Sequence, residues 1–402
     1  MTASVASGIM DRLRQLEPQM LSLLERIVRI NSHTPNKAGV DAVGVVLAEV
    51  MRDMGFVVEV HPQKELGDNL VARNAAALAL AEGEQQVLFC GHMDTVFPAD
   101  GGFDCFERSV EHGALRVVGP GVVDMKGGLV VGIHALGALA EAGLLERMPV
   151  TFIFNSDEET GSYQSRELVM AEARKSAFAM VFECAGLNGE TTTGRKGKTT
   201  FRLKATGQAG HAGNLSGPKA SAILELAHKT VALEALNDSA RGVSVNVGLV
   251  CGGLGPNIIA SSAEAVVECR YRQAADAQGL TDAVTAMAAM PDVPGTTLEL
   301  EIIPGRPAME QTPANRRLLA VVREAGAELG VPVQEDFRGG VSDANYIAHV
   351  GCPVIDGMGP MGAGDHSPRE FMLVASLAQR AALTAVALDR LWDEHHRGDL
   401  FG

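Results

Sequence analysis

The order of apolar and polar positions in the first half of the chain predicts alternating helices and strands. Apolar residues spaced three and four apart follow Pro18, which favours a helix that begins near this proline. Short apolar runs bounded by Gly or polar residues are typical of buried strands. Helices are therefore expected after residue 18 and over 41–54 and 125–141, and strands over 56–60, 86–90 and 150–154. This alternation predicts a layered α/β domain with a mixed, mostly parallel sheet.

The alternation of single predicted helices and strands stops at residue 191 and resumes after Pro304. Between these points the expected order is strand, helix, two strands, helix, strand. The strands are predicted over 201–205, 244–250, 265–270 and 298–302, and the helices over 219–234 and 277–290. This order is typical of a split βαβ, ferredoxin-like α+β module. We therefore expect an inserted domain over 191–307 and a catalytic domain made of 1–190 and 308–402.

The composition indicates a globular enzyme and argues against several kinds of partner. A chain of 402 residues is longer than is usual for a domain with a single hydrophobic core, so two domains are expected. With 34 basic and 49 acidic residues the formal net charge is −15, which argues against nucleic acid and anionic membranes. No apolar run is long enough to span a bilayer, and the first residues do not resemble a signal peptide. The six cysteines lack CxxC spacing, which favours a reducing compartment, the cytoplasm.

Acidic residues and histidines follow or flank several of the predicted strands and helices. They are His92, Asp94, Asp124, Glu158, Glu159, Glu183 and His366. Zinc binds imidazole nitrogen and carboxylate oxygen, and a catalytic zinc keeps one position for water. A pair of zinc ions sharing a water needs two imidazoles, a bridging carboxylate, a terminal carboxylate for each ion and a spare glutamate. The set therefore predicts a dinuclear metal site in a hydrolase that acts on an amide bond.

Spacing within this set predicts different roles for neighbouring residues. His92 and Asp94 lie two apart at the end of a strand and point the same way, so Asp94 can orient the imidazole by a hydrogen bond. Glu158 and Glu159 are adjacent, so one should bind metal while the other acts as general base. Each residue alone also fits a structural role, such as a helix start for the glutamates or an N-cap for Asp124. We favour the metal site because segments that are distant in sequence can converge where strands end.

Six short motifs extend this pattern over nearly the whole chain. They are Gly-His-Met-Asp-Thr-Val at 91–96, Gly-Val-Val-Asp-Met-Lys-Gly-Gly at 121–128, Asp-Glu-Glu-Thr-Gly-Ser at 157–162, Gly-His-Ala-Gly at 210–213, Gly-Gly-Leu-Gly-Pro-Asn at 252–257 and Ser-Asp-Ala at 342–344. Together they resemble the dinuclear-zinc exopeptidases and deacylases. This family includes bacterial glutamate carboxypeptidase, aminoacylases, acetylornithine deacetylase and succinyl-diaminopimelate desuccinylase. The chain most resembles the glutamate carboxypeptidase branch.

The resemblance implies a role for each residue of the metal set. The implied ligands are His92 and Glu183 for one zinc ion, Glu159 and His366 for the other, and Asp124 as the bridge between them. Glu158 becomes the general base, and Asp94 becomes the residue that orients His92. Two zinc ions per subunit are implied, and cobalt or manganese suits the same donors. The family also tends to hold a cis peptide after the bridging aspartate, here Asp124–Met125.

The resemblance also assigns residues in the inserted domain, which it makes a lid and dimerisation domain. His211 would reach the active site of the partner subunit and stabilise the oxyanion, which implies a homodimer formed through the insert. Asn257 and Arg306 would contact the substrate, with the arginine clasping its carboxylate. By contrast, we expect a structural ion pair for Arg270 and a helix cap for Ser342.

The expected reaction releases a C-terminal amino acid from a small N-acyl amino acid or peptide, as in glutamate carboxypeptidase. Glutamate-releasing enzymes carry a lysine shortly before the strand that leads to the Gly-His-Ala-Gly turn, and residues 187–193 contain none. An N-acyl-amino-acid deacylase of the aminoacylase or acetylornithine deacetylase kind is therefore the alternative. A non-catalytic metal-binding homologue should have lost Glu158 or a ligand, and none is missing. An isomerase or racemase on the same metals is a further alternative.

Overall fold

The structure is a computed structural model that describes residues 1, 3–214 and 217–401. Its contacts divide the chain into two compact units. Unit 1 comprises Met1–Gly194, Gln311–Phe337 and Ser342–Gly402, and unit 2 comprises Arg195–Glu310 and Arg338–Val341. The boundary expected at residue 191 falls inside β8 (Glu190–Arg195), which pairs with β13 (Gln334–Arg338). All of β8 except its last residue therefore belongs to unit 1.

Unit 1 is built around a six-stranded sheet in the order β1-β2-β6-β3-β7-β14. The strands are β1 Val57–His61, β2 Asn69–Arg73, β3 Gln86–His92, β6 Val150–Asn155, β7 Ser176–Val181 and β14 Val354–Ile355. β3 runs parallel to β6 and β7, and β14 runs parallel to β7, whereas β1 and β2 are antiparallel. Every residue of β3, β6 and β7 is buried, as expected for central strands covered on both faces. The predicted α/β class with a mixed sheet is confirmed.

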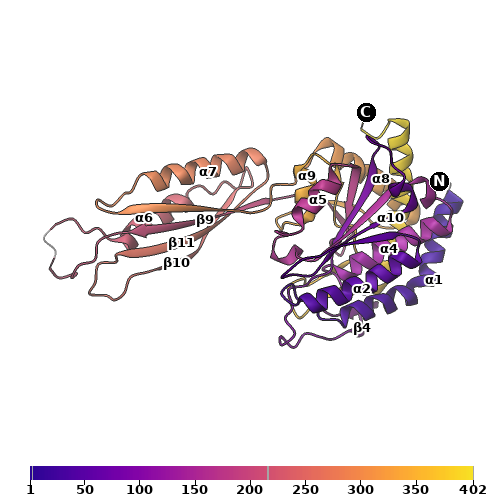
Figure 1. The fold of residues 1–402 in the computed structure, drawn as a ribbon, viewed down its shortest axis with the longest axis horizontal. Helices are drawn as coiled ribbons and strands as arrows, with labels where there is room; N and C mark the ends of the chain where they lie inside the picture. The colour runs from indigo at the N-terminus through magenta and orange to yellow at the C-terminus, as the bar shows by residue number, and fades with distance from the viewer. Residues whose placement is uncertain (2, 215–216, 402) are drawn as a thin grey trace. The chain divides into compact units, whose positions relative to one another are not determined.

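Helices cover this sheet (Figure 1). They are α1 Ala3–Val28, α2 Lys37–Asp53, α3 Ala75–Leu78, α4 Lys126–Glu141, α5 Arg166–Ala173, α8 Pro313–Leu329, α9 Asp343–His349 and α10 Val374–Arg397. α10 packs against α1, α4 and α8, while α5 and α9 pack on each other and against β7. In the part of the chain that the structure describes, no helix is both long and apolar enough to cross a membrane.

The prediction that the first helix begins near Pro18 is wrong. α1 begins at Ala3 and continues through Pro18 to Val28. A proline inside a helix removes one backbone hydrogen bond and disfavours the helix locally. Here the apolar stripe runs on both sides of the proline, with Leu13 and Leu24 both fully buried. Burial of this stripe against α4 and α10 outweighs the local preference.

The two glycines that follow Lys126 let α4 approach the segments that carry acidic residues. A Cβ atom on Gly128 would lie 1.9 Å from the carbonyl oxygen of Phe182, and one on Gly127 would lie 2.1 Å from that of Val122. Neither position can accept a side chain without a backbone shift. The helix therefore begins in direct contact with the segment that follows β7.

A smaller four-stranded sheet in unit 1 has the order β15-β16-β5-β4. Its strands are β4 Glu107–Glu111, β5 Ala114–Val118, β15 Gly362–Ala363 and β16 Phe371–Leu373. The sequence patterns did not predict this sheet. The loop between β15 and β16 carries His366, and the pairing of β16 with β5 fixes where that loop starts and ends.

Unit 2 has the predicted split βαβ order. Its elements are β9 Gly197–Thr206, α6 Ala222–Glu234, β10 Ser244–Gly252, β11 Ser262–Tyr271, α7 Ala274–Ala289 and β12 Thr297–Pro304. They form an antiparallel sheet in the order β10-β11-β9-β12, with its own apolar core. Arg195 and Met309 exchange two backbone hydrogen bonds of 2.9 and 3.1 Å. The chain therefore enters and leaves unit 2 at neighbouring points.

Candidate metal centre

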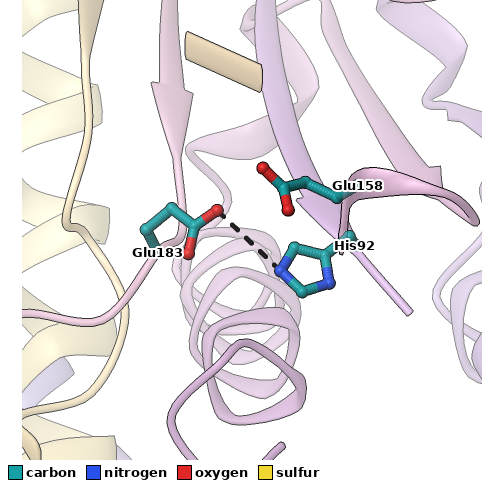
Figure 2. A group of neighbouring side chains, drawn as sticks. All are labelled: His92, Glu158 and Glu183. Carbon is teal, nitrogen blue, oxygen red and sulfur yellow. Dashed lines mark ion pairs between the residues drawn. The ribbon is translucent and has the colours of Figure 1, made fainter. Parts of the chain in front are cut away.

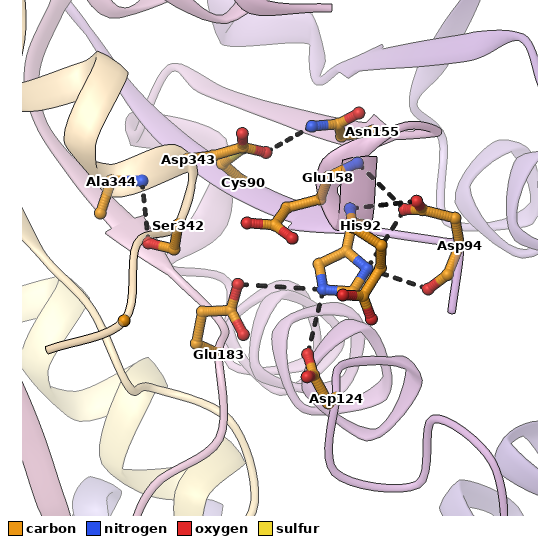
Figure 3. Close-up of polar contacts among 12 residues, drawn as sticks. Cys90, His92, Asp94, Asp124, Asn155, Glu158, Glu183, Ser342, Asp343 and Ala344 are labelled. Atoms are coloured by element: carbon orange, nitrogen blue, oxygen red, sulfur yellow. Dashed lines mark hydrogen bonds and ion pairs between the residues drawn. The ribbon is translucent and has the colours of Figure 1, made fainter. Parts of the chain in front are cut away.

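Seven of the predicted site residues come together in unit 1 where the central strands end. Figure 3 labels five of them, His92, Asp94, Asp124, Glu158 and Glu183. His92 is the last residue of β3, and Asp94 follows it by two. Glu158 and Glu159 open a short 3₁₀ turn after β6, and Glu183 lies two residues beyond β7. Asp124 and His366 come from the segment before α4 and from the loop between β15 and β16. Carboxyl ends of strands are where open α/β sheets place their sites.

Asp124 lies between two histidines and turns a different oxygen toward each. Its Oδ1 is 3.1 Å from His92 Nε2, and its Oδ2 is 3.2 Å from His366 Nε2. His92 Nε2 is also 3.8 Å from Glu183 Oε1, as Figure 2 shows. His366 Nε2 is 3.1 Å from Glu159 Oε2. The distances therefore define two groups of one histidine and one glutamate, with Asp124 shared between them.

These separations suit metal ions. Zinc binds nitrogen and oxygen at about 2.0–2.2 Å, so two donors of one tetrahedral ion lie about 3.3 Å apart. Donor atoms of His92, Glu158 and Glu183 lie within 4.8 Å of one another, as do those of His92, Asp124 and Glu159. Both sets contain His92, and each contains one of the two adjacent glutamates. In chemistry and in spacing, the residues fit a pair of divalent cations.

The negative charges of the clustered carboxylates also favour the binding of cations. Hydrogen bonds to Asp124 and Glu159 raise the pKa of His366 to about 11. Burial works against the charged form of His92, but its hydrogen bond to Asp124 still raises the pKa well above the usual value. Burial and the charge of Asp124 raise the pKa of Glu159 to about 8, and the same two causes raise that of Glu183. Protons are therefore drawn to positions where a divalent cation would supply the positive charge.

Asp94 is fully buried and holds two parts of the site together. Its carboxylate accepts hydrogen bonds from the backbone N–H groups of Glu158 and Glu159, both at 3.2 Å, and from Thr34 Oγ at 2.7 Å. His92 Nδ1 lies 3.3 Å from Asp94 Oδ1 and 3.0 Å from the Asp94 carbonyl oxygen. This contact leaves Nε2 facing Asp124. Asp94 therefore contacts the imidazole of His92 through its carbonyl and carboxylate oxygens, and its carboxylate also binds the backbone at the start of the glutamate turn.

The sequence reasoning missed Glu370. This fully buried residue accepts hydrogen bonds from the backbone N–H groups of Gly121, Val123 and Asp124 at 3.1, 2.9 and 3.1 Å. It follows His366 by four residues, so a single loop supplies an imidazole and also anchors the backbone of Asp124. Burial and the charge of Asp124 raise the pKa of Glu370 to about 8. Nothing in its sequence surroundings distinguishes it from a solvent-exposed loop glutamate.

Local backbone features agree with the expectations for this region. The Asp124–Met125 peptide is cis, and Ser342 caps α9 by accepting a hydrogen bond from the Ala344 N–H group. His366 has a φ of 58°, in the left-handed region that favours glycine. Such conformations are typical of functional sites, where surrounding contacts hold them in place.

The other three predicted residues belong to unit 2. The loops of His211 and Asn257 are neighbours, because the Ala212 N–H group donates to the Asn257 carbonyl oxygen at 3.0 Å. Both side chains are exposed, whereas Arg306 is buried after the end of β12. Arg270 forms the predicted ion pair, at 2.7 Å from Glu268. The roles of His211, Asn257 and Arg306 stay predictions.

The α/β fold and a cluster of histidines and carboxylates at its strand ends define a metal-dependent hydrolase. A model of the family described as peptidase family M20/M25/M40 matches residues 88–390. The chain belongs to this family, which confirms the resemblance and makes the protein a hydrolase of amide bonds.

Curated relatives span almost the same length as this chain. It is 30% identical over 382 residues to carboxypeptidase G2 from Pseudomonas sp. strain RS-16, which covers 92% of this chain and 88% of the relative. It is 29% identical over 388 residues to a succinyl-diaminopimelate desuccinylase from Gluconacetobacter diazotrophicus, covering 92% and 96%. The two relatives differ in the type of reaction that their names state.

Solved structures share the fold at lower sequence identity. A crystal structure of aminopeptidase PepT from Bacillus cereus has a TM-score of 0.72 and 22% identity, over 93% of this chain and 98% of that one. A dinuclear metal binding peptidase of the M20 family from Bacillus subtilis has a TM-score of 0.69 and 14% identity, over 94% and 99%. At these identities the likeness concerns the fold alone.

Replacing Glu370 by glutamine should loosen the segment that carries Asp124. An amide offers one acceptor oxygen and turns an NH₂ group toward backbone N–H groups, so buried donors lose their partner. We expect the free energy of unfolding to fall by about 1–3 kcal/mol, measured by urea denaturation, together with less bound metal per chain. Glu141→Gln, in an exposed ion pair with Arg12, is the control. Equal stability and metal content in the two variants would contradict the anchoring role.

Proposed function

We propose that the protein is a dinuclear zinc hydrolase that releases a C-terminal amino acid from a small N-acyl amino acid or peptide. The observation that carries this proposal is the position of Asp124, whose two oxygens face separate histidines at 3.1 and 3.2 Å. A shared carboxylate is what a pair of ions needs, and cobalt or manganese would suit the same donors. The 30% identity to carboxypeptidase G2 supports release of a C-terminal residue.

The proposed ligands are His92 and Glu183 for one ion and Glu159 and His366 for the other, with Asp124 between them. Each histidine lies within 4 Å of its proposed carboxylate partners. When bound, the ions supply Lewis acidity that polarises the amide carbonyl and makes water more acidic.

In the proposed reaction Glu158 moves the proton. Its carboxylate takes a proton from the attacking water as the water oxygen bonds to the carbonyl carbon, and passes it to the leaving nitrogen as the C–N bond breaks. Asp94 holds the backbone of Glu158 during both steps. Asn257 and Arg306 bind the free carboxylate of the substrate, for which a guanidinium is well suited. His211 of a second copy stabilises the charge that develops on the carbonyl oxygen.

The alternative is removal of a small acyl group from an amino acid. It is supported by the 29% identity to a succinyl-diaminopimelate desuccinylase over nearly the full length of both chains. The bond cleaved and the proton path are the same in both cases. The two reactions differ only in which side of the amide is recognised.

A homodimer formed through unit 2 is part of the proposal. β10 is an edge strand, with Leu249 68% exposed and Val250 57% exposed. On α6, which packs against β10, Val231 is 73% exposed and Ile223 is 46% exposed. An unpaired strand edge beside exposed apolar side chains favours pairing with another chain. A second copy would cover this surface, which we call the β10–α6 surface.

A substrate panel tests the reaction. Zinc-loaded protein should release free amino acid from at least one of a set of dipeptides, N-aroyl amino acids, N-acetyl amino acids and N-succinyl amino acids. Release should stop when a chelator removes the metal and return when zinc is added back. A preference for dipeptides and aroyl compounds favours the carboxypeptidase, and a preference for acetyl or succinyl compounds favours the deacylase. Absence of metal-dependent release across the panel would contradict the proposal.

Replacing Glu158 by glutamine should remove the proton carrier and leave the ligands in place. We expect kcat to fall by about 10²–10⁴-fold, with metal content unchanged by mass spectrometry. Glu167→Gln, an exposed glutamate on α5, should keep the wild-type rate. If Glu158→Gln turned over substrate normally, another residue would have to be the base.

Mixing two inactive variants tests the exchange of His211 between subunits. His211→Ala and Glu158→Gln should each be nearly inactive. If His211 acts on the partner's site, one site of every mixed dimer is intact, so unfolding and refolding an equal mixture should restore about a quarter of the wild-type rate.

The matched control adds Leu249→Asp to both chains, because a charge on the β10–α6 surface should yield monomers by light scattering and abolish the recovery. Recovery in a monomeric mixture, or no recovery in a dimeric one, would count against the exchange.

A further inference from the structure

Asp343 holds together the turn that carries Glu158 and Glu159. We infer that Asp343 is a positioning residue for Glu158, a role that rests on the proposed function of Glu158 as general base. Asp343 lies in the Ser-Asp-Ala motif, for which the sequence indicated only the cap formed by Ser342. Asp343 is 2% exposed.

Residues on both sides of the glutamate turn donate hydrogen bonds to the carboxylate of Asp343. Asn155, the last residue of β6, donates from Nδ2 to Asp343 Oδ2 at 2.5 Å, as Figure 3 shows. Ser162, just beyond the turn, donates from Oγ to Asp343 Oδ1 at 2.5 Å. Asn155 and Ser162 are also joined directly, Nδ2 to Oγ, at 3.2 Å. Asp343 therefore fixes the distance between the residues that precede and follow the two glutamates.

A second buried carboxylate holds the same turn at its backbone. Asp94 accepts the N–H groups of Glu158 and Glu159. Asp94 comes from the segment after β3, whereas Asp343 begins α9, so the two carboxylates belong to independent elements. The turn is held at its backbone by one and at its ends by the other. With both in place, the Glu158 backbone has little freedom to shift.

The conformation of the turn depends on these contacts. Ser162 has a φ of 54° and is fully buried, and the preceding Gly161 has a φ of 110°. A left-handed backbone at a residue other than glycine is unfavourable and persists only where contacts enforce it. The serine hydroxyl bonded to Asp343 is such a contact. Tyr346, also on α9, donates from its hydroxyl to the Gly161 carbonyl oxygen at 3.1 Å.

Asp343 is itself held firmly. Ser342 caps α9 in a reciprocal capping box with Asn345, and Ser342 Oγ donates to the buried Asp356 at 2.7 Å. α9 packs on α5, the helix that follows the glutamate turn. The position of Asp343 is thus set by the protein core. A change at residue 343 therefore acts on the turn, where the hydrogen-bond partners are, while the ligands His92, Asp124, Glu183 and His366 keep their own supports.

The test is Asp343→Asn, which keeps the size of the side chain but replaces one of the two acceptor oxygens by an NH₂ group, so that Asn155 and Ser162 no longer both donate to an acceptor. We expect kcat to fall roughly 100-fold, as for a misplacement of about 1 Å at a reacting group, with KM within about threefold of wild type. Two metal ions per chain should still bind, by mass spectrometry, because four of the five proposed ligands lie outside the turn and only Glu159 lies on it. The exchange N155D/D343N restores a donor opposite an acceptor, so it should regain at least about tenfold of the lost kcat.

Glu172→Gln is the matched control, because Glu172 is an equally buried carboxylate that hydrogen-bonds Gln86 at the other end of β3. It should lower stability and leave kcat unchanged. Ser162→Ala removes one of the two contacts and should lower kcat less than Asp343→Asn, so it tests the idea even if Asp343→Asn does not fold.

Wild-type kcat in Asp343→Asn, a loss of rate that follows loss of metal, or a folded exchange variant without recovery would each overturn the inference. The proposed function is tested separately in the same assay. An active Glu158→Gln would overturn the assignment of the base, whereas an inactive Glu158→Gln beside an active Asp343→Asn would overturn only the role of Asp343.

Discussion

The repulsion among carboxylates gathered around Asp124 is the constraint on which the rest of the site depends. Asp94, Glu183 and Glu370 are buried, and Glu159 lies beside the same aspartate. Carboxylates that are buried close together repel one another, and this repulsion raises their pKa values so that some become protonated. Hydrogen bonds from backbone N–H groups and from imidazoles keep these residues in position. Burial and the charge of Asp124 raise the pKa of Glu159, and hydrogen bonds to Asp124 and Glu159 raise the pKa of His366, so protons offset negative charge that a bound divalent cation would also offset.

The parts of this arrangement that depend on local sequence were predictable. Continuous apolar runs indicated β3 and β6; His92 is the last residue of β3, and the glutamate pair begins three residues after β6 ends. The split βαβ order of unit 2 was likewise predictable from the order of apolar and polar positions. The predicted helix start near Pro18 is wrong because burial of the apolar face of α1 outweighs the tendency of proline to interrupt a helix.

The supports of the site were not predictable, because they depend on contacts between distant segments. Glu370 reaches residues almost 250 positions earlier, with a separation of 247 to Val123, and Asp343 meets Asn155 across 188 positions. No periodicity or spacing reports such a contact. The adjacent glutamates are a related case. The sequence predicts only that Glu158 and Glu159 differ in role. In the structure, donor atoms of Glu158 lie near those of His92 and Glu183, and donor atoms of Glu159 lie near those of His92 and Asp124.

The β-bridge between Arg195 and Met309 has a consequence for how this protein can vary in evolution. The chain enters unit 2 at Arg195 and leaves it near Met309, and these two residues are hydrogen-bonded to each other. Any segment inserted between them therefore begins and ends at neighbouring points. Every residue of the carboxylate and imidazole cluster lies outside this segment. The segment can therefore be lengthened, shortened or exchanged for another module during evolution without moving a metal-binding side chain, so that substrate range and assembly can diverge while the residues proposed to bind the metal are preserved.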